Sequence, residues 1–268
     1  MGSELDPGRV GDYFSNRGTV EKWWTPDTGP LSFHYDAELA ILDEHLDVNP
    51  AWQVLDVGTG RGRFGLYMAE QGCRVIGVDI NPEMLEIARE AAQQRGVSER
   101  FELRTSGAED LTEFSTATFD LVMCMELFDH LPDLDRALVS MRRTLKPGGC
   151  FLFTYVASES IYGFSGNVYR WLHARLAPGR TMISRTYSLR EVQRRLAEGG
   201  FALERFFGVG ILCANAQTRL FVDNPITRAL TAVARAEARR WPYYTRPFLA
   251  RLGAHVVGFA RPADGAGP

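Results

Sequence analysis

Residues 54–62 read VLDVGTGRG, an apolar run that ends in three closely spaced glycines. Such a run is typical of a buried strand, here over residues 53–57, that turns through a loop into a helix. Glycine accepts positive φ and lets a ligand approach the backbone, and the free N–H groups at a helix start suit a carboxylate or a phosphate. The stretch therefore predicts a nucleotide-type binding loop around Gly58, Gly60 and Gly62.

Further apolar runs follow this loop at regular intervals. Short runs that predict strands cover residues 74–79, 101–105, 119–124 and 150–155, with two more near 201–208 and 254–261. Apolar residues at helical spacing separate the first runs over residues 62–71, 82–95 and 134–145. This alternation predicts βα units that feed a parallel sheet.

The regions around this core read as helical caps. We expect an N-terminal helical cap over residues 1–48 that contains a helix over 37–46, a main domain over 49–262, and a disordered tail over 263–268. Helical insertions over about 158–186 and 212–252 interrupt the main domain.

Composition narrows the class of protein. The 268 residues are 45% hydrophobic and 24% charged, as in globular proteins. The four cysteines are widely separated, so we expect reduced thiols and neither a metal site nor a disulfide framework. No run has the length of a spanning helix and the N-terminus does not resemble a signal peptide, so we expect a cytoplasmic protein.

The glycine loop also fits a second family of nucleotide-binding folds. Gly60, Gly62 and Gly65 match the dinucleotide fingerprint, but the glycine that directly follows the strand is Gly58. Counted from Gly58, the sixth position is Arg63, which lacks the glycine or alanine that close helix packing needs. The register therefore favours another ligand, although an NAD-type oxidoreductase stays an alternative.

Two acidic residues complete the predicted cofactor site. Asp56 immediately precedes the loop and suits a ligand with a cationic amino group. Asp79 ends the second apolar run, where a carboxylate can accept hydrogen bonds from ribose hydroxyls. A helix cap before Pro82 is the structural alternative for Asp79.

Together with SGAEDL at 106–111, FDLV at 119–122 and LKPGG at 145–149, these residues resemble class I S-adenosylmethionine (SAM) dependent methyltransferases. The resemblance covers about residues 53–155 and is closest to quinone-biosynthesis and natural-product methyltransferases. It implies an α/β Rossmann-like fold: a seven-stranded, mainly parallel sheet with an antiparallel last strand, plus N-terminal and C-terminal helical caps. The implied cofactor is SAM, and the product is S-adenosylhomocysteine.

The same resemblance implies the cofactor-binding residues. They are Asp56, Gly58, Thr59, Gly60, Gly62, Asp79, Ile80, Met84, Gly107, Ala108, Glu109, Cys124 and Met125. One departure is Gly107, where many relatives carry an Asp that contacts the adenine amine. Backbone atoms or Glu109 would take over that contact.

His130 is the candidate catalytic residue, because it follows the fourth strand and can remove a hydroxyl proton near neutral pH. A packing role remains its alternative, and Asp129 either orients it or is exposed. Aromatic residues and histidines of both caps predict a small aromatic or amphipathic acceptor. The candidate substrate-binding residues are Phe14, Trp24, His34, Phe128, His130, Tyr155, Tyr162, Phe164 and Tyr169.

Three functions remain from these observations. The first is methyl transfer to a small organic acceptor, with O-methylation favoured over C- or N-methylation. The second is an NAD-type oxidoreductase, and the third is a SAM-binding protein of this fold that transfers no methyl group.

A nucleic-acid partner is disfavoured because no lysine-rich patch exists. Residues 226–239 could contact a membrane surface, but packing of this segment against the main domain is the preferred interpretation.

Overall fold

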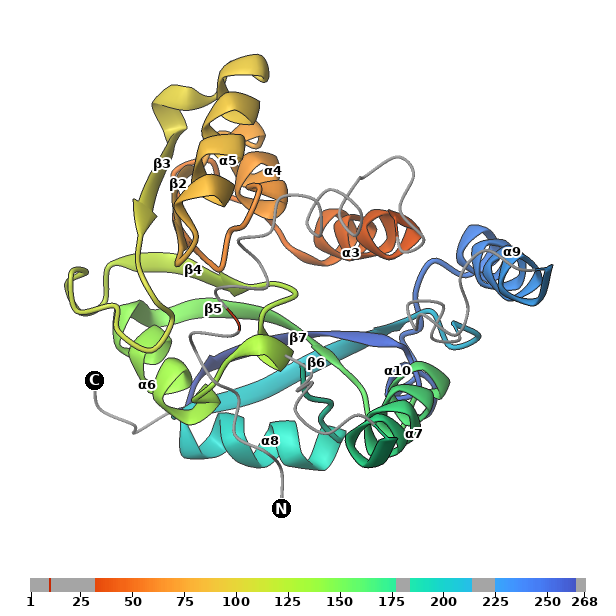
Figure 1. Cartoon of the computed structure of the whole chain (residues 1–268). Coiled ribbons are helices and arrows are strands. Elements are labelled where there is room, and N and C mark those ends of the chain that lie inside the picture. Colours follow the sequence, from red (N-terminus) through yellow and green to blue (C-terminus); the bar gives the residue numbers. More distant parts are fainter. Residues whose placement is uncertain (1–9, 11–31, 177–183, 214–224, 264–268) are drawn as a thin grey trace.

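The computed structural model describes residue 10 and residues 32–176, 184–213 and 225–263. Their core is one seven-stranded sheet in the order β3-β2-β1-β4-β5-β7-β6 (Figure 1). The strands are β1 (Gln53–Val57), β2 (Arg74–Asp79), β3 (Phe101–Thr105), β4 (Phe119–Cys124), β5 (Leu145–Val156), β6 (Phe201–Val209) and β7 (His255–Pro262). The first five strands run parallel, and β7 is antiparallel to both β5 and β6. The structure thus confirms the predicted Rossmann-like sheet.

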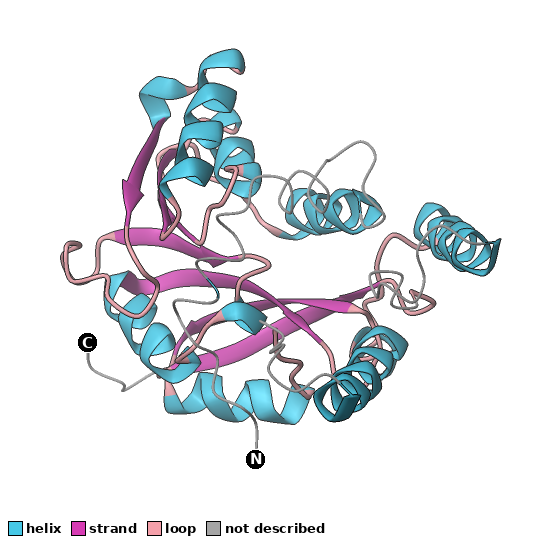
Figure 2. Cartoon of the chain, viewed as in Figure 1, coloured by secondary structure: helices cyan, strands magenta, loops and turns pink. Residues whose placement is uncertain are grey.

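Helices cover both faces of this sheet (Figure 2). They are α3 (Ser32–His45), α4 (Arg63–Glu70), α5 (Pro82–Gln94), α6 (Leu134–Thr144), α7 (Ile161–Leu176), α8 (Leu189–Glu198), α9 (Pro225–Arg240) and α10 (Pro247–Ala250). Alternate residues of β4 divide between the two layers, as the pleat requires. Leu121 and Met123 pack with α3, α4 and α5, whereas Val122 and Cys124 pack with α6 and α8.

Several helices begin at capping side chains. Asn81 accepts a hydrogen bond from the N–H of Glu83 at 2.9 Å, and Pro82 follows as the first residue of α5. Asp133 accepts from the N–H of Arg136 at 3.0 Å at the start of α6. These caps satisfy N–H groups that have no partner within the helix.

β5 begins at Leu145, five residues before the predicted start at 150. The Nζ of Lys146 lies 2.9 Å from both carboxylate oxygens of Asp120 on β4. This ion pair holds the LKPGG segment beside β4, and the pairing register shifts there between Phe119 and Leu121. Residues 145–149 therefore form an irregular first part of the strand.

The cap segments are helical where they are described. α3 begins at Ser32, five residues before the predicted helix start. α7 lies between β5 and β6, and α9 and α10 lie between β6 and β7, where helical insertions were expected. The proposed domain limits stay predictions, and residues 264–268 of the predicted tail lie outside the described residues.

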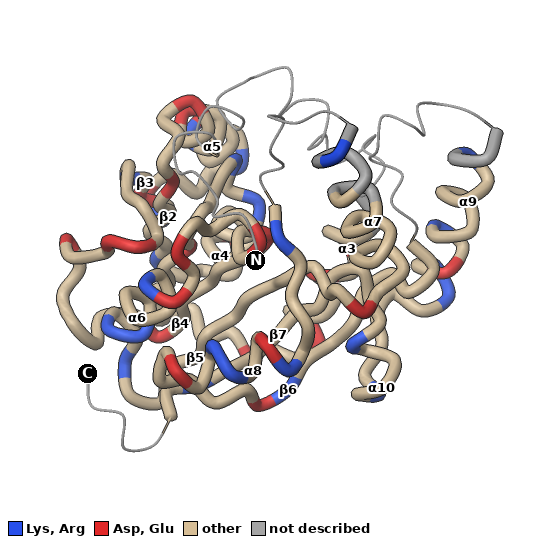
Figure 3. The backbone as a smooth tube through the Cα atoms, turned by 60° about the horizontal axis from the view of Figure 1, so that its bottom comes forward, with Lys and Arg blue, Asp and Glu red and all other residues tan. Residues whose placement is uncertain are grey.

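Basic and acidic residues are unevenly distributed along the chain (Figure 3). α9 carries exposed arginines at 228, 235, 239 and 240, whereas its one acidic residue, Glu237, is buried. Glu237 accepts hydrogen bonds from the N–H groups of Ile211 and Leu212 at 2.9 and 2.8 Å. None of the described helices is long and apolar enough to cross a membrane.

Candidate functional site

The carboxyl ends of the parallel strands meet at one edge of the sheet, where the loop after β1 forms the centre of the site. Gly58 and Gly60 have φ of +70° and +52°. The N–H groups of Gly58 and Thr59 donate to the carbonyl of Val78 at 2.8 and 2.9 Å, which ties the loop to β2. A Cβ at Gly58 would lie 2.5 Å from Leu127, whereas one at Gly60 would meet no described atom within 4 Å. The loop is closely packed at Gly58 and open at Gly60.

Asp56 lies buried beneath this loop. Its carboxylate accepts the Thr59 hydroxyl at 2.6 Å and a hydrogen bond from the N–H of Gly65. Burial raises the pKa of Asp56 to about 6, although both hydrogen bonds favour the ionised form. Gly62, with φ of +81°, ends the loop as the N-cap of α4. The contacts of Asp56 assign it a role in shaping the loop, while its predicted contact with a cofactor stays untested.

Asp79 joins the loop to the tip of β2. It accepts hydrogen bonds at 2.9 Å from the N–H of Gly60 and from the N–H of Asn81, one on each oxygen. A third donor is the N–H of Ile80, and burial nevertheless raises the pKa of the carboxyl group. A carboxylate has about four lone-pair sites, so Asp79 retains room for an additional donor. The ribose contact of Asp79 stays a prediction.

The residues predicted around the adenine lie at the ends of β2, β3 and β4. Ile80, the residue that follows β2, is 49% exposed. A Cβ at Gly107 would lie 3.8 Å from Ile80 and 3.8 Å from a carboxylate oxygen of Glu109, so these three residues are neighbours. The other predicted members are buried: Met84, Ala108, Cys124 and Met125. Burial also raises the pKa of the Cys124 thiol well above its ordinary value.

His130 lies in the short helix η2 (Phe128–His130) that follows β4. Its Nε2 is 3.4 Å from a carboxylate oxygen of Asp129, and its side chain is 15% exposed. Asp129 itself is buried, so it can hold the imidazole in one orientation. This pair is compatible with both interpretations of His130, the catalytic and the structural one.

The candidate substrate-binding aromatics divide into different environments. Phe128 and Tyr155 are buried, and their rings stack on Phe153 at 5.0 and 6.4 Å, so core packing accounts for their positions. Phe164 is 66% exposed on α7. Phe14 and Trp24 lie outside the described residues, as does the side chain of Tyr169. Of this set, His34 and Tyr162 come together, and they do so around a residue that was not predicted.

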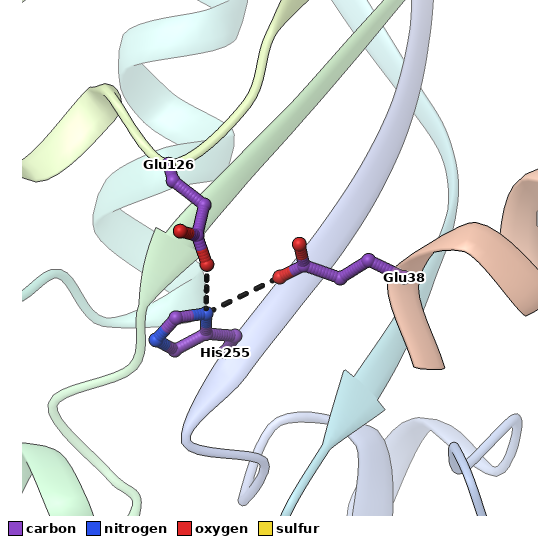
Figure 4. Close-up of side chains that lie close together, drawn as sticks. All are labelled: Glu38, Glu126 and His255. Atoms are coloured by element: carbon purple, nitrogen blue, oxygen red, sulfur yellow. Dashed lines mark hydrogen bonds and ion pairs between the residues drawn. The ribbon is translucent and has the colours of Figure 1, made fainter. Parts of the chain in front are cut away.

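That residue is His255, the first residue of β7, and it lies between two carboxylates (Figure 4). Its Nδ1 is 3.2 Å from Oε1 of Glu38 on α3 and 3.1 Å from Oε1 of Glu126 after β4. The ring of His34 lies 4.8 Å from the ring of His255, and that of Tyr162 lies 6.2 Å from it. We call Glu38, Glu126 and His255 the carboxylate–histidine cluster.

Opposite charges offset the burial of this cluster. Burial, followed by the charge of Glu126, raises the pKa of Glu38. Burial also opposes ionisation of Glu126, but the hydrogen bond and charge of His255, together with Arg63, lower its pKa. Burial disfavours the His255 cation as well, yet the two carboxylates raise its pKa. The guanidinium of Arg63 lies 3.6 Å from Glu126 and connects the cluster to the start of α4, directly after the glycine loop.

Sequence reasoning missed all three members of the cluster. Glu38 and His255 are 217 positions apart, so no motif spacing connects them. Glu126 belongs to the segment that contains His130, but nothing in that segment indicates that its side chain turns towards β7. The feature that marks Glu126 is its positive φ of 54°, and this is visible only in the structure.

A family profile described as "Methyltransferase domain" matches residues 55–153. The matched segment contains the glycine loop, Asp79 and Glu126, whereas Glu38 and His255 lie outside it. The cluster therefore joins one residue of the profile to two residues that the profile does not cover.

Curated relatives similar to this chain carry the name "Ubiquinone biosynthesis O-methyltransferase". That of Idiomarina loihiensis is 32% identical over 56% of this chain and 60% of its own length. That of Chromobacterium violaceum is 28% identical over 81% of this chain and 94% of its own length. For three relatives of this name the match covers 54% to 60% of their length, so the chain spans little more than half of them.

A solved structure from Thermotoga maritima has a similar fold. It is described as a SAM-dependent methyltransferase and possible histamine N-methyltransferase, and it superposes with a TM-score of 0.63. The superposition covers 94% of this chain and 99% of that one at 21% identity. At this identity the likeness concerns the fold alone.

Proposed function

We propose that the chain is a class I SAM-dependent methyltransferase and that it transfers the methyl group of SAM to a hydroxyl oxygen of a small aromatic or amphipathic molecule. One arrangement carries the proposal. The hydrogen bond between Gly60 and Asp79 joins the loop to an acidic strand tip, and among the described residues the space beside Gly60 is open. An open backbone and an acid at this edge suit a ligand with both a methionine part and a ribose.

The chain offers a suitable group for each part of the cofactor. The start of α4 would receive the methionine carboxylate, since a helix N-terminus favours anions. Asp79 would accept the ribose hydroxyls, and the exposed side chain of Ile80 would cover one face of the adenine. Gly107, Ala108, Glu109, Met84, Cys124 and Met125 would complete the adenine slot. SAM then supplies a methyl group on a positively charged sulfur, which an oxygen nucleophile can attack.

Oxygen as the methylated atom is supported by two observations. The curated relatives are named O-methyltransferases, at 28% to 35% identity. The carboxylate–histidine cluster lies next to Arg63 and thus close to the loop, and it offers a proton-binding group at the same sheet edge. A hydroxyl acceptor needs such a group, because its oxygen must lose a proton when it gains the methyl group.

Binding and turnover test this proposal separately. Titration calorimetry with SAM, S-adenosylhomocysteine and NAD should give heat for the first two ligands, and selective binding of NAD would contradict the proposal. Incubation with SAM and a panel of phenol, catechol and 4-nitrophenol should give methoxy products detectable by NMR. SAM binding without transfer to any hydroxyl, amine or carbon acceptor would instead favour a SAM-binding protein that transfers no methyl group.

A further inference from the structure

The carboxylate–histidine cluster lies where three separate parts of the chain meet at the edge of the glycine loop. β7 runs antiparallel to β5, and the register pairs His255 with Val156, the last residue of β5. His255 therefore lies at the carboxyl ends of the parallel strands, although it begins its own strand. Glu126 leaves β4 at the same edge, and α3 brings Glu38 to it (Figure 4).

Local backbone strain directs Glu126 into the cluster. Its φ of 54° is unfavourable for a residue other than glycine, and such strain persists only where surrounding contacts hold it. Here the N–H of Glu126 donates to the hydroxyl of Thr154 at 2.5 Å. The next residue, Leu127, packs against Gly58 of the loop. The position of Glu126 is thus fixed from both sides, and its side chain turns towards His255 and Arg63.

When His255 is protonated on both ring nitrogens, the charges of the cluster balance without an added ion. Two carboxylates, Glu38 and Glu126, face two basic groups, His255 and Arg63. An imidazole nitrogen carries one proton, so Nδ1 can donate to one carboxylate at a time while the other stays close by. Oε2 of Glu38 is buried and has no hydrogen-bond partner among the described residues. The cluster thus has spare capacity to bind a proton, and it holds Nδ1 of His255 in the protonated form.

The other ring nitrogen, Nε2, points away from both carboxylates (Figure 4). The rings around His255 are those of His34 and Tyr162, two residues that the sequence predicts for acceptor binding. The geometry points to His255 as the catalytic residue that takes up the hydroxyl proton of the acceptor at Nε2, with Glu126 and Glu38 as positioning residues. This inference rests on the proposed O-methylation.

The proposed step balances in protons and electron pairs. The acceptor oxygen forms a bond to the methyl carbon, and the bond from that carbon to the sulfonium sulfur breaks with its electron pair left on sulfur. The hydroxyl proton moves to Nε2, and the imidazolium so formed is stabilised by the two carboxylates. The proton then passes to solvent. In a second route the acceptor binds as an anion beside a His255 that is already protonated. This route involves the same total number of protons as the first, so the two are kinetically equivalent.

The ionisation of His255 controls the pH dependence in this scheme. The charged and titratable groups that face it come from α3, the turn after β4, α4 and α7: Glu38, His34, Glu126, Arg63 and Tyr162. The two carboxylates raise the pKa of His255. Removal of either charge should therefore lower that pKa and move the rising limb of the pH–rate profile to lower pH.

Acceptors of different acidity test the proposal. With phenol as the probe, His255→Gln should lower kcat by about 100-fold or more, the usual contribution of a general base. With 4-nitrophenol, at a pH where this phenol is mostly ionised, the same variant should retain most of its activity. A purely structural role of His255 would lower both rates equally and would overturn the proposal. SAM binding by calorimetry should stay within a factor of about three of the wild type.

His45 on α3 offers a control. It is half-buried and stacks on Phe207 at 4.3 Å, but it lies outside the cluster. His45→Gln should retain the wild-type ratio of phenol to 4-nitrophenol turnover. If His255→Gln does not fold, the pH–rate profile of Glu126→Gln decides, and an unshifted profile overturns the proposal.

Two further outcomes would also overturn it. One is a wild-type chain that binds SAM and methylates amines but none of the phenols, which leaves the cofactor assignment intact. The other is phenol turnover that EDTA abolishes and Mg²⁺ restores, because the cluster would then hold a divalent cation instead of a proton. Failure to bind SAM would count against the proposed function itself and is detected before any acceptor is added.

Discussion

The backbone N–H of Gly60 donates to the carboxylate of Asp79 at 2.9 Å, which joins two loops that are 19 positions apart in the sequence. The opposite oxygen of Asp79 accepts the N–H of Asn81, whose own side chain caps α5. One carboxylate thus sets the position of both the glycine loop and the start of a helix. Its burial raises its pKa, so this arrangement carries an energetic cost that a functional site can explain.

Replacing Asp79 by Ala should weaken SAM binding by about 10- to 100-fold, because the variant loses the loop contact and the acceptor for ribose together. Asp79→Asn keeps one carbonyl oxygen, so its affinity for SAM should lie between those of the wild type and Asp79→Ala. Calorimetry with SAM measures the effect, and Asp47→Ala, which removes an exposed carboxylate, serves as the control. Equal affinity in Asp79→Ala and the control would show that Asp79 has no part in cofactor binding.

A methyl group at Gly58 should destabilise the fold in two separable ways. Gly58 and Gly96 have nearly the same φ, 70° and 68°, so alanine costs roughly 1–3 kcal/mol of backbone strain at each. A Cβ at Gly58 would also lie 2.5 Å from Leu127, whereas one at Gly96 would meet no described atom within 4 Å. Gly58→Ala should therefore lose about 1–3 kcal/mol more than Gly96→Ala in urea unfolding. Similar losses in the two variants would contradict the close contact.

Asp56 should make the stability of the fold fall as the pH rises from about 4 to about 6. Its pKa is raised from 3.8 to about 6 in the folded chain, so the folded state holds a proton that the unfolded state has already lost. The difference corresponds to roughly 3 kcal/mol of stability that is present below pH 4 and absent above pH 6. Urea unfolding at several pH values measures it. Asp56→Asn should flatten this dependence, and an unchanged slope in that variant would exclude Asp56 as its source.

The sequence predicts the first four strands to the residue because each is a short apolar run with turn residues at both ends. β1, β2, β3 and β4 begin and end as expected. The start of β5 could not be predicted in this way, since it depends on the contact of Lys146 with Asp120 across two strands. The first turn of α3 likewise depends on a distant partner: the ring of Tyr35 packs edge-on against Phe64 at 5.4 Å.

The candidate site divides along the same line. The glycine loop and Asp79 lie within one βα unit, so residue order and spacing place them. The carboxylate–histidine cluster depends on how α3 and β7 pack together at the sheet edge. No local sequence pattern predicts that packing. The aromatic residues differ from both, because an aromatic side chain suits the core and a substrate pocket equally well. Their burial has to be known before the two roles can be told apart.

Phe128 and Phe164 allow that last distinction to be measured. Phe128 is fully buried and stacks on Phe153, whereas Phe164 is 66% exposed on α7. Phe128→Ala should cost about 3–5 kcal/mol of unfolding free energy, because it removes a buried ring and leaves a cavity. Phe164→Ala should change that free energy by no more than about 0.5 kcal/mol, as exposed positions usually do. If Phe164 nevertheless contacts an acceptor, its alanine variant should raise KM for the probe phenols while its stability stays unchanged. A large loss of stability in Phe164→Ala, or a small one in Phe128→Ala, would contradict the packing described here.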